Sequence, residues 1–88
     1  FEVEATLVQH TAVLEAAVIG VPDENGLTRV KAYVVVKEGA HVEADALQAF
    51  VKERLAPYKY PRQIEFIKEL PKTATGKIQR FRLRAANA

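Results

Sequence analysis

The 88-residue sequence is long enough for one domain, and its 49% hydrophobic and 27% charged content is typical of a folded globular chain rather than a disordered one. The absence of cysteine excludes disulfides, thiolate-bound zinc and a cysteine nucleophile. No apolar run approaches the roughly 18 residues of a membrane span. Residues 1–56 carry a net charge of −4 and residues 57–88 a net charge of +6. This basic C-terminal third indicates an anionic partner, whether a nucleotide, a nucleic acid or an acidic surface.

The N-terminal half of the sequence predicts one short helix and a β-hairpin. A helix over residues 2–10 is expected because Val3, Leu7 and His10 or Thr11 recur at helical spacing. The apolar segment 13–21 ends at the turn signal 22–26, and a second apolar run over 30–37 should pair with it as an antiparallel strand. Consecutive Val and Ala residues in both runs indicate a sheet that is covered on both faces.

The C-terminal half predicts two further helices around a third strand. Residues 43–55 carry an apolar stripe opposite a polar face, as an amphipathic helix packed on a sheet does; the stripe is Ala44, Leu47, Phe50, Val51 and Leu55. A short strand over 64–68, a loop over 70–77 and a last helix over 78–86 follow. The resulting order αββαβα predicts an α+β fold, with a small three-stranded sheet flanked by helices.

The segment 73–77, TATGK, combines small hydroxyl residues with Gly76 and Lys77. Glycine permits a positive φ and a close backbone approach, and lysine presents a compact positive charge, so this loop could offer an ammonium group to an anion. It is not a P-loop, because Pro71 stands where that motif has its first glycine and Ile78 stands where it has Ser or Thr. The alternative is a solvent-exposed lysine after an ordinary glycine turn.

The segment 57–62, PYKYPR, alternates aromatic rings with cations between two prolines. The prolines restrict the backbone, the rings offer stacking surfaces for a base, and the cations offer contacts to phosphates. The alternative is a structural connector between a helix and a strand, with the tyrosines at the edge of the core.

The remaining charged and imidazole side chains give weaker indications. The last segment carries five basic residues: Lys72, Lys77, Arg80, Arg82 and Arg84. Such residues most often form the solvated face of a helix, and nucleic-acid binding is the alternative. One Phe81 and a net charge of +2 support that alternative poorly, and a mobility-shift assay at low and high salt would test it. His10 and His41 show no metal-ligand spacing, so no metal site is predicted.

The stretch Leu70–Arg80, LPKTATGKIQR, resembles the C-terminal signature of the adenylate-forming enzymes, which comprise acyl- and aryl-CoA synthetases, adenylation domains and luciferases. The resemblance extends back through APYKYPR, VKAYVVVK and AAVIGVPDENG to FEVEATLVQH and so covers essentially the whole chain. Within the family, these segments are most similar in sequence to those of the benzoate-type ligases. An adenylation domain that loads a carrier protein is the alternative, disfavoured because such domains usually have Asn-Gly-Lys where this chain has Thr-Gly-Lys.

The resemblance implies that residues 1–88 are the mobile C-terminal lid domain of a larger enzyme, whose N-terminal AMP-binding domain and hinge lie outside this sequence. Such an enzyme activates a carboxylic acid with Mg²⁺-ATP to an acyl-adenylate and then lets the thiol of CoA displace AMP. The small domain rotates between the two half-reactions. We therefore expect a cytoplasmic protein whose partners are the N-terminal domain, ATP, CoA and a carboxylic acid, with neither nucleic acid nor membrane among them. The isolated fragment should bind no cofactor and have no activity.

The resemblance also assigns roles to single residues. Lys77 falls on the adenylation lysine of the family, and Thr75 and Gly76 would shape its loop. The Pro-x4-Gly-Lys context that starts at Pro71 implies that a protein acetyltransferase can acetylate Lys77, which would remove its charge. Incubation with such an enzyme and acetyl-CoA, followed by mass spectrometry, tests this expectation.

A second group of residues matches the segment that lines the CoA nucleotide site in the family. Tyr58 would stack on the adenine of CoA, whereas Tyr60 and Arg62 would lie near its phosphates, with Lys59 between them in the sequence. Lys52 aligns with a position at which some relatives have an arginine that contacts phosphate.

Overall fold

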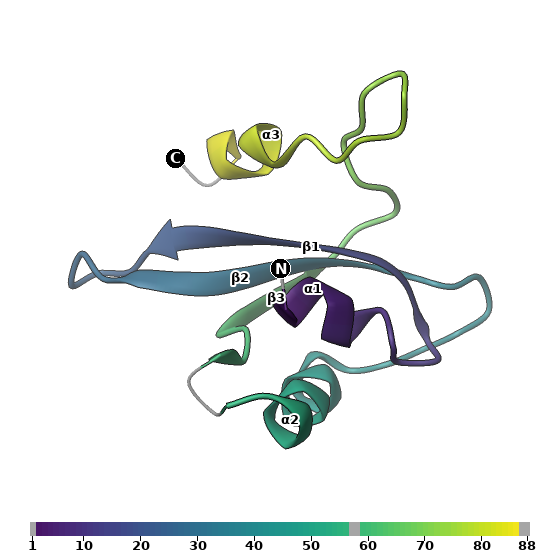
Figure 1. Cartoon of the computed structure of the whole chain (residues 1–88), viewed down its shortest axis with the longest axis horizontal. Helices are drawn as coiled ribbons and strands as arrows, with labels where there is room; N and C mark the ends of the chain where they lie inside the picture. The colour runs from purple at the N-terminus through teal and green to yellow at the C-terminus, as the bar shows by residue number, and fades with distance from the viewer. Residues whose placement is uncertain (1, 57–58, 87–88) are drawn as a thin grey trace.

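The structure, a computed structural model, describes residues 2–56 and 59–86 (Figure 1). Its elements follow the order αββαβα, as the sequence predicted: α1 (Glu2–Leu7), β1 (Val13–Pro22), β2 (Thr28–Val36), α2 (Ala44–Arg54), β3 (Gln63–Phe66) and α3 (Arg80–Ala85). The strands form one mixed sheet in the order β1-β2-β3, in which β1 and β2 are antiparallel and β2 and β3 are parallel. This confirms the predicted α+β fold.

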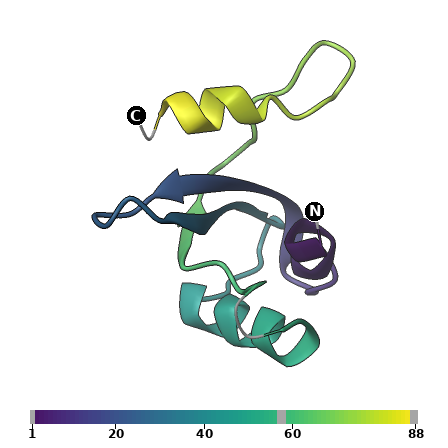
Figure 2. The ribbon, with the colours of Figure 1, turned by 60° about the vertical axis from the view of Figure 1, so that its left-hand side comes forward.

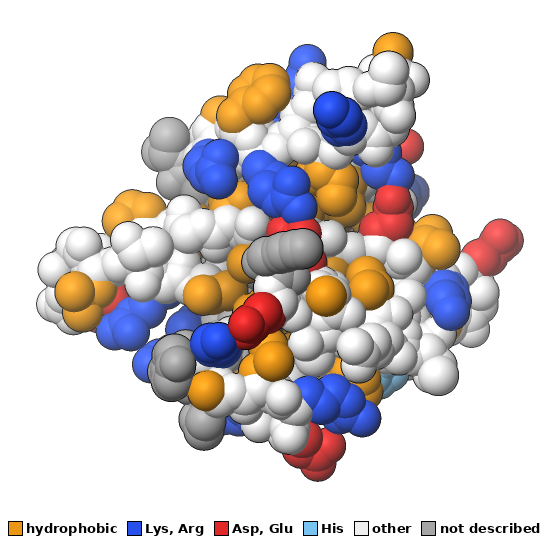
Figure 3. All heavy atoms as spheres, viewed as in Figure 1, with side chains coloured by type: hydrophobic (Ala, Val, Ile, Leu, Met, Phe, Trp, Pro, Cys, Tyr) orange, Lys and Arg blue, Asp and Glu red, His pale blue; other side chains and the backbone are white. Residues whose placement is uncertain are grey.

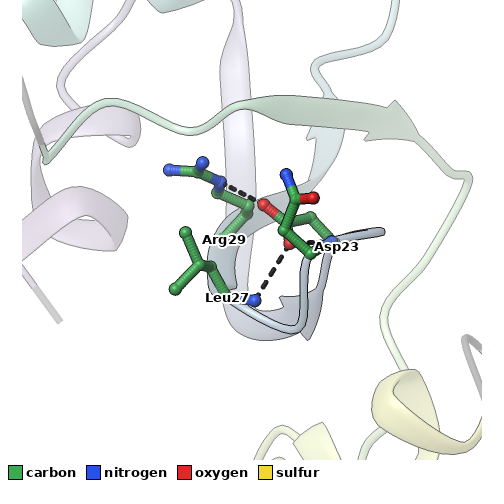
Figure 4. A network of polar contacts seen from close by, with 4 residues as sticks. Asp23, Leu27 and Arg29 are labelled. Carbon is green, nitrogen blue, oxygen red and sulfur yellow. Dashed lines mark hydrogen bonds and ion pairs between the residues drawn. The ribbon is translucent and has the colours of Figure 1, made fainter.

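The turn between β1 and β2 is organised by the side chain of Asp23. One carboxylate oxygen accepts hydrogen bonds from the backbone N–H groups of Asn25 and Leu27, each at 2.9 Å, and the other accepts a 2.8 Å hydrogen bond from Nε of Arg29 (Figure 4). Gly26 closes the turn with φ of 79°, a conformation that glycine adopts without steric cost. The turn signal in the sequence therefore acts through Asp23, whose carboxylate accepts the backbone N–H hydrogen bonds in place of a backbone carbonyl.

The parallel pairing of β3 with β2 requires a crossover connection, and α2 provides it. Residues 63–66 pair in register with residues 31–34, and Ile64 lies opposite Ala32. At the start of β3 the backbone N–H of Arg62 donates to the carbonyl of Val30 at 2.9 Å, so the hydrogen-bonded pairing begins before the strand itself.

Both faces of the sheet are buried, as the runs of Val and Ala predicted. In Figures 1 and 2, α1 and α2 lie on one side of the sheet and α3 lies on the other. The first core joins the sheet to α1 and α2: Val3, Leu7, Val13, Ala16, Ala32, Val34, Leu47 and Val51. The second core joins the sheet to α3 and the segment before it: Ala17, Ile19, Val21, Tyr33, Val35, Leu70 and Leu83. Each face of the small sheet is thus covered by its own helix or helices and has its own core.

Helix α1 is shorter than predicted, because His10 takes part in a turn instead of extending the helix. Its Nδ1 accepts a 3.1 Å hydrogen bond from the backbone N–H of Ala12, and its ring packs edge-on against Phe50 with centroids 5.0 Å apart. Helix α1 therefore ends at Leu7, and the chain turns into β1. Within the described residues, no helix is both long and apolar enough to cross a lipid bilayer.

The last helix begins later than predicted. Ile78 pairs with Lys72 as an antiparallel partner, and the backbone N–H of Gln79 donates to the carbonyl of Pro71 at 2.8 Å. Because these backbone groups are engaged with the preceding segment, α3 starts at Arg80 rather than at residue 78. The predicted third strand over 64–68 is likewise shifted to Gln63–Phe66.

Candidate functional site

The loop that carries Lys77 is a small β-hairpin. Thr73 and Lys77 face each other across it, since the N–H of Thr73 donates to the carbonyl of Lys77 at 2.9 Å and the N–H of Lys77 donates to Oγ1 of Thr73 at 3.1 Å. A 2.9 Å hydrogen bond from the N–H of Gly76 to the carbonyl of Thr73 closes the turn, and Oγ1 of Thr75 lies 2.9 Å from Oγ1 of Thr73. Gly76 has φ of 88°, the left-handed residue that typically follows the turn in a short hairpin of this kind.

Lys77 is exposed to solvent, and its ammonium makes neither a hydrogen bond nor an ion pair with the residues that the structure describes. The hairpin extends away from the sheet in both ribbon views (Figures 1 and 2). A Cβ placed on Gly76 would have no atom within 4 Å, so the tip is in open space. The charge of Lys77 is therefore available to an external anion.

A second cationic site surrounds the ring of Tyr60. Nζ of Lys52 lies 4.1 Å from the ring centroid and Cζ of Arg62 lies 5.5 Å from it, both within cation–π range. Lys52 comes from α2 and Arg62 from the segment before β3. Nε2 of Gln48 holds the two elements together by donating to the carbonyls of Pro61 and Arg62, at 3.0 and 3.2 Å.

The structure thus brings together three of the residues singled out for CoA: Lys52, Tyr60 and Arg62. The ammonium of Lys59 instead pairs with the carboxylate of Glu2 at 2.6 Å, which links the segment to α1. The hydrogen bond from Lys59 lowers the pKa of Glu2 below its usual range. Tyr58 lies outside the described residues.

The Lys77 hairpin and the Tyr60 site lie on opposite sides of the sheet. Helix α2 and Tyr60 pack on the first core, whereas Ile78 and Leu70 at the base of the hairpin pack on the second. Figures 1 and 2 show the two layers separated by the sheet. Figure 3 shows Lys and Arg side chains gathered over α3 and the hairpin. The domain therefore offers an anion two distinct cationic faces.

Two carboxylates near the hairpin, Glu4 and Glu15, were not singled out from the sequence. Oε2 of Glu4 accepts hydrogen bonds from Nε of Arg80 at 2.9 Å and from the backbone N–H of Val18 at 2.8 Å, and its Oε1 pairs with Nη2 of Arg80. Burial raises the pKa of Glu4, but the hydrogen bonds from Arg80 and Val18 outweigh burial and hold the pKa below its usual range. Glu15 on β1 pairs with Lys72.

The only sequence signal for these pairs is the uneven charge distribution. Among the described residues, three ion pairs join a carboxylate of the acidic N-terminal part to a cation of the basic C-terminal part: Glu2–Lys59, Glu4–Arg80 and Glu15–Lys72. Part of the basic excess is therefore neutralised within the domain instead of facing a partner. No group of three or more His, Cys, Asp or Glu side chains that could hold a metal ion occurs among the described residues.

Comparison with known proteins identifies the class. Residues 2–77 match the family described as "AMP-binding enzyme C-terminal domain", and the chain belongs to that family. It is 58% identical over 88 residues to the benzoate–CoA ligase of Thauera aromatica, covering 97% of this chain and 17% of the relative. It is 55% identical over 82 residues to a long-chain-fatty-acid–CoA ligase of Bacillus subtilis, covering 93% of this chain and 15% of the relative. The chain thus spans about a sixth of the length of these relatives.

Solved structures show the same architecture. A benzoate CoA ligase from Burkholderia xenovorans superimposes with a TM-score of 0.86 and 62% identity, over 94% of this chain and 17% of that one. The anthranilate CoA ligase AuaEII, solved with anthranoyl-AMP, gives a TM-score of 0.90 and 50% identity, over 98% of this chain and 17% of that one. The described fold is therefore that of the C-terminal domains of acyl- and aryl-CoA ligases, and one of these similar enzymes holds an acyl-adenylate.

Proposed function

We propose that this chain is the mobile C-terminal domain of an ATP-dependent, AMP-forming aryl-CoA ligase that acts on benzoate or a closely related aromatic acid. Its partner is the N-terminal AMP-binding domain of the same enzyme. The observation that carries the proposal is the presence of two cationic sites on opposite faces of the sheet. Such a domain can serve two half-reactions by turning one face and then the other toward the substrates.

In the first half-reaction, Lys77 supplies the charge that adenylation needs. An oxygen of the substrate carboxylate attacks the α-phosphorus of ATP, and the bond to pyrophosphate breaks. Both reacting groups are anionic, so an ammonium between them reduces their repulsion and stabilises the charge of the transition state. The exposed Lys77, on a hairpin shaped by Thr73, Thr75 and Gly76, is suited to enter a site formed by the larger domain.

In the second half-reaction, the opposite face serves CoA. The thiolate of CoA attacks the carbonyl carbon of the acyl-adenylate, a thioester bond forms, and AMP leaves. Lys52 and Arg62, whose cations lie beside the ring of Tyr60, contact the phosphates of CoA in this proposal, and Lys59 and Tyr58 are their neighbours in the sequence. We assign adenine stacking to Tyr58 from the family resemblance alone.

The activity is tested with the full-length enzyme, ATP, CoA and either benzoate or palmitate. We expect benzoyl-CoA, AMP and pyrophosphate as products, with kcat/KM for benzoate at least about tenfold above that for palmitate, as pocket selectivity commonly gives. Product nucleotide and thioester are measured by liquid chromatography. Preference for palmitate would contradict the aromatic substrate, and formation of benzoyl-AMP without benzoyl-CoA would favour an enzyme that loads a carrier protein.

Replacing Arg62 by alanine is expected to weaken CoA binding selectively. Losing one charged contact to a phosphate should raise the KM for CoA by about tenfold, while ATP–pyrophosphate exchange stays within about twofold of the wild type. Steady-state kinetics and isotope exchange on the full-length enzyme measure the two effects.

Arg54→Ala is the matched control for this experiment. Arg54 also lies over an aromatic ring, since its Cζ is 3.7 Å from the centroid of Phe50, but it is not part of the Tyr60 site. Its replacement should leave the KM for CoA within about twofold of the wild type. A similar rise in both variants would contradict a specific role for Arg62.

A further inference from the structure

The base of the Lys77 hairpin is held to the rest of the domain by two ion pairs, one on each side of the hairpin. Lys72, at the start of the first strand, pairs with Glu15 on β1. Arg80, three residues after Lys77, pairs with Glu4 on α1. We propose that Glu4 is a positioning residue for adenylation: through Arg80 it fixes the orientation of the hairpin and hence the place of the Lys77 ammonium. This inference rests on the proposed role of Lys77.

The position of Lys77 depends on the base of the hairpin, because the tip of the hairpin is exposed to solvent. A Cβ on Gly76 would meet no atom within 4 Å, and Ala74, Thr75 and Lys77 are all exposed. The hydrogen bonds between Thr73 and Lys77 make the hairpin stiff within itself. A stiff hairpin with an exposed tip transmits any rotation at its base to Lys77.

Apolar packing alone cannot fix that rotation. Leu70, Ile78 and Leu83 anchor the segment in the second core, but hydrophobic contacts are not directional. The pairing of Arg80 with Glu4 is directional, because both carboxylate oxygens face two nitrogens of one planar guanidinium.

Glu4 is itself firmly placed. Its side chain is only 17% exposed, and its Oε2 also accepts the 2.8 Å hydrogen bond from the N–H of Val18 on β1. One carboxylate thus joins α1, β1 and the start of α3. Glu4 and Arg80 are 76 positions apart in the chain, so their ion pair fixes the base of the hairpin relative to the N-terminal part of the domain.

The test uses Glu4→Gln in the full-length enzyme with benzoate as substrate. The substitution keeps the size of the side chain but removes its charge and one acceptor. We expect the rate of ATP–pyrophosphate exchange to fall by about tenfold or more, since small displacements of a catalytic group are costly. Thioester formation from supplied benzoyl-AMP and CoA should stay within about twofold of the wild type.

A double variant separates positioning from a general structural effect. If Glu4 acts through Lys77, Glu4→Gln should cause no further loss of exchange when Lys77 is already alanine. A further loss of about tenfold in that background would overturn the proposal. Arg80→Lys provides a second variant that retains the charge but lacks the planar fork, and it should show the same selective loss of exchange.

Asp23→Asn is the matched control. Asp23 also accepts hydrogen bonds from an arginine and from backbone N–H groups, but it organises the turn between β1 and β2, at the other end of the molecule from the hairpin (Figures 1 and 4). Its replacement should leave exchange within about twofold of the wild type. Equal losses of exchange in the Asp23 and Glu4 variants would overturn the proposal, as would unchanged exchange in Glu4→Gln. Unchanged exchange in Lys77→Ala would instead contradict the proposed function itself.

Discussion

Replacing Lys77 by alanine in the full-length enzyme is expected to slow adenylation by about 10²–10³-fold, the usual effect of removing one charge-stabilising donor from an active site. ATP–pyrophosphate exchange with benzoate measures this step. Thioester formation from supplied benzoyl-AMP and CoA should remain within about twofold of the wild type. The expected split follows from the geometry, because Lys77 and the Tyr60 site lie on opposite faces of the sheet.

A second lysine variant controls for loss of charge as such. Lys37 is also exposed, in the segment that follows β2, and Lys37→Ala removes the same charge from a position outside the hairpin. It should leave both half-reactions unchanged. If Lys77→Ala impaired the two half-reactions equally, the assignment of Lys77 to adenylation would be wrong.

The fold could be predicted from the sequence because its elements have strong local patterns. The apolar stripe of residues 43–55 gave α2, and the two Val-rich runs gave a hairpin with both faces buried. The ends of α1 and α3 could not be predicted, because they are set by contacts with other segments. His10 contacts Phe50, and Ile78 pairs with Lys72, and neither partner is visible in a local window.

The candidate site could be predicted only in part. The composition of the TATGK segment and its resemblance to a family singled out Lys77, and the same resemblance grouped Lys52 with Tyr60, but no local pattern of residues predicts that the two side chains touch. Their contact depends on how α2 packs beside the segment that leads into β3, which Gln48 fixes through two backbone carbonyls.

The charge distribution is the feature for which the structure differs most from the sequence-based prediction. The basic C-terminal third predicts an anionic partner, yet Lys59, Lys72 and Arg80 are paired with carboxylates of the N-terminal part. These partners lie 57 or 76 positions away, and local patterns carry no information over such separations. Among the described residues, fewer cations therefore remain without a carboxylate partner, and Lys77, on its hairpin, is one of them.

Replacing Gly76 by valine is expected to impair adenylation by about 100-fold without unfolding the domain, because displacing a catalytic group by about an ångström can cost that much. Gly76 has φ of 88°, which a β-branched residue does not tolerate. A Cβ there would have no atom within 4 Å, so the strain is conformational and the exposed tip can relieve it by rearranging. Such a rearrangement would move the adjacent Lys77.

Two other glycines of the chain provide matched controls. Gly26 and Gly39 have φ of 79° and 80°, and a Cβ at either would also have no atom within 4 Å. The same substitution there imposes the same strain, about 1–2 kcal/mol, in turns that do not carry Lys77. All three valine variants should lose a similar, small amount of thermal stability, which thermal unfolding monitored by circular dichroism measures. Only Gly76→Val should lose ATP–pyrophosphate exchange. Equal loss of exchange in all three variants would show that stability, rather than the placement of Lys77, limits adenylation.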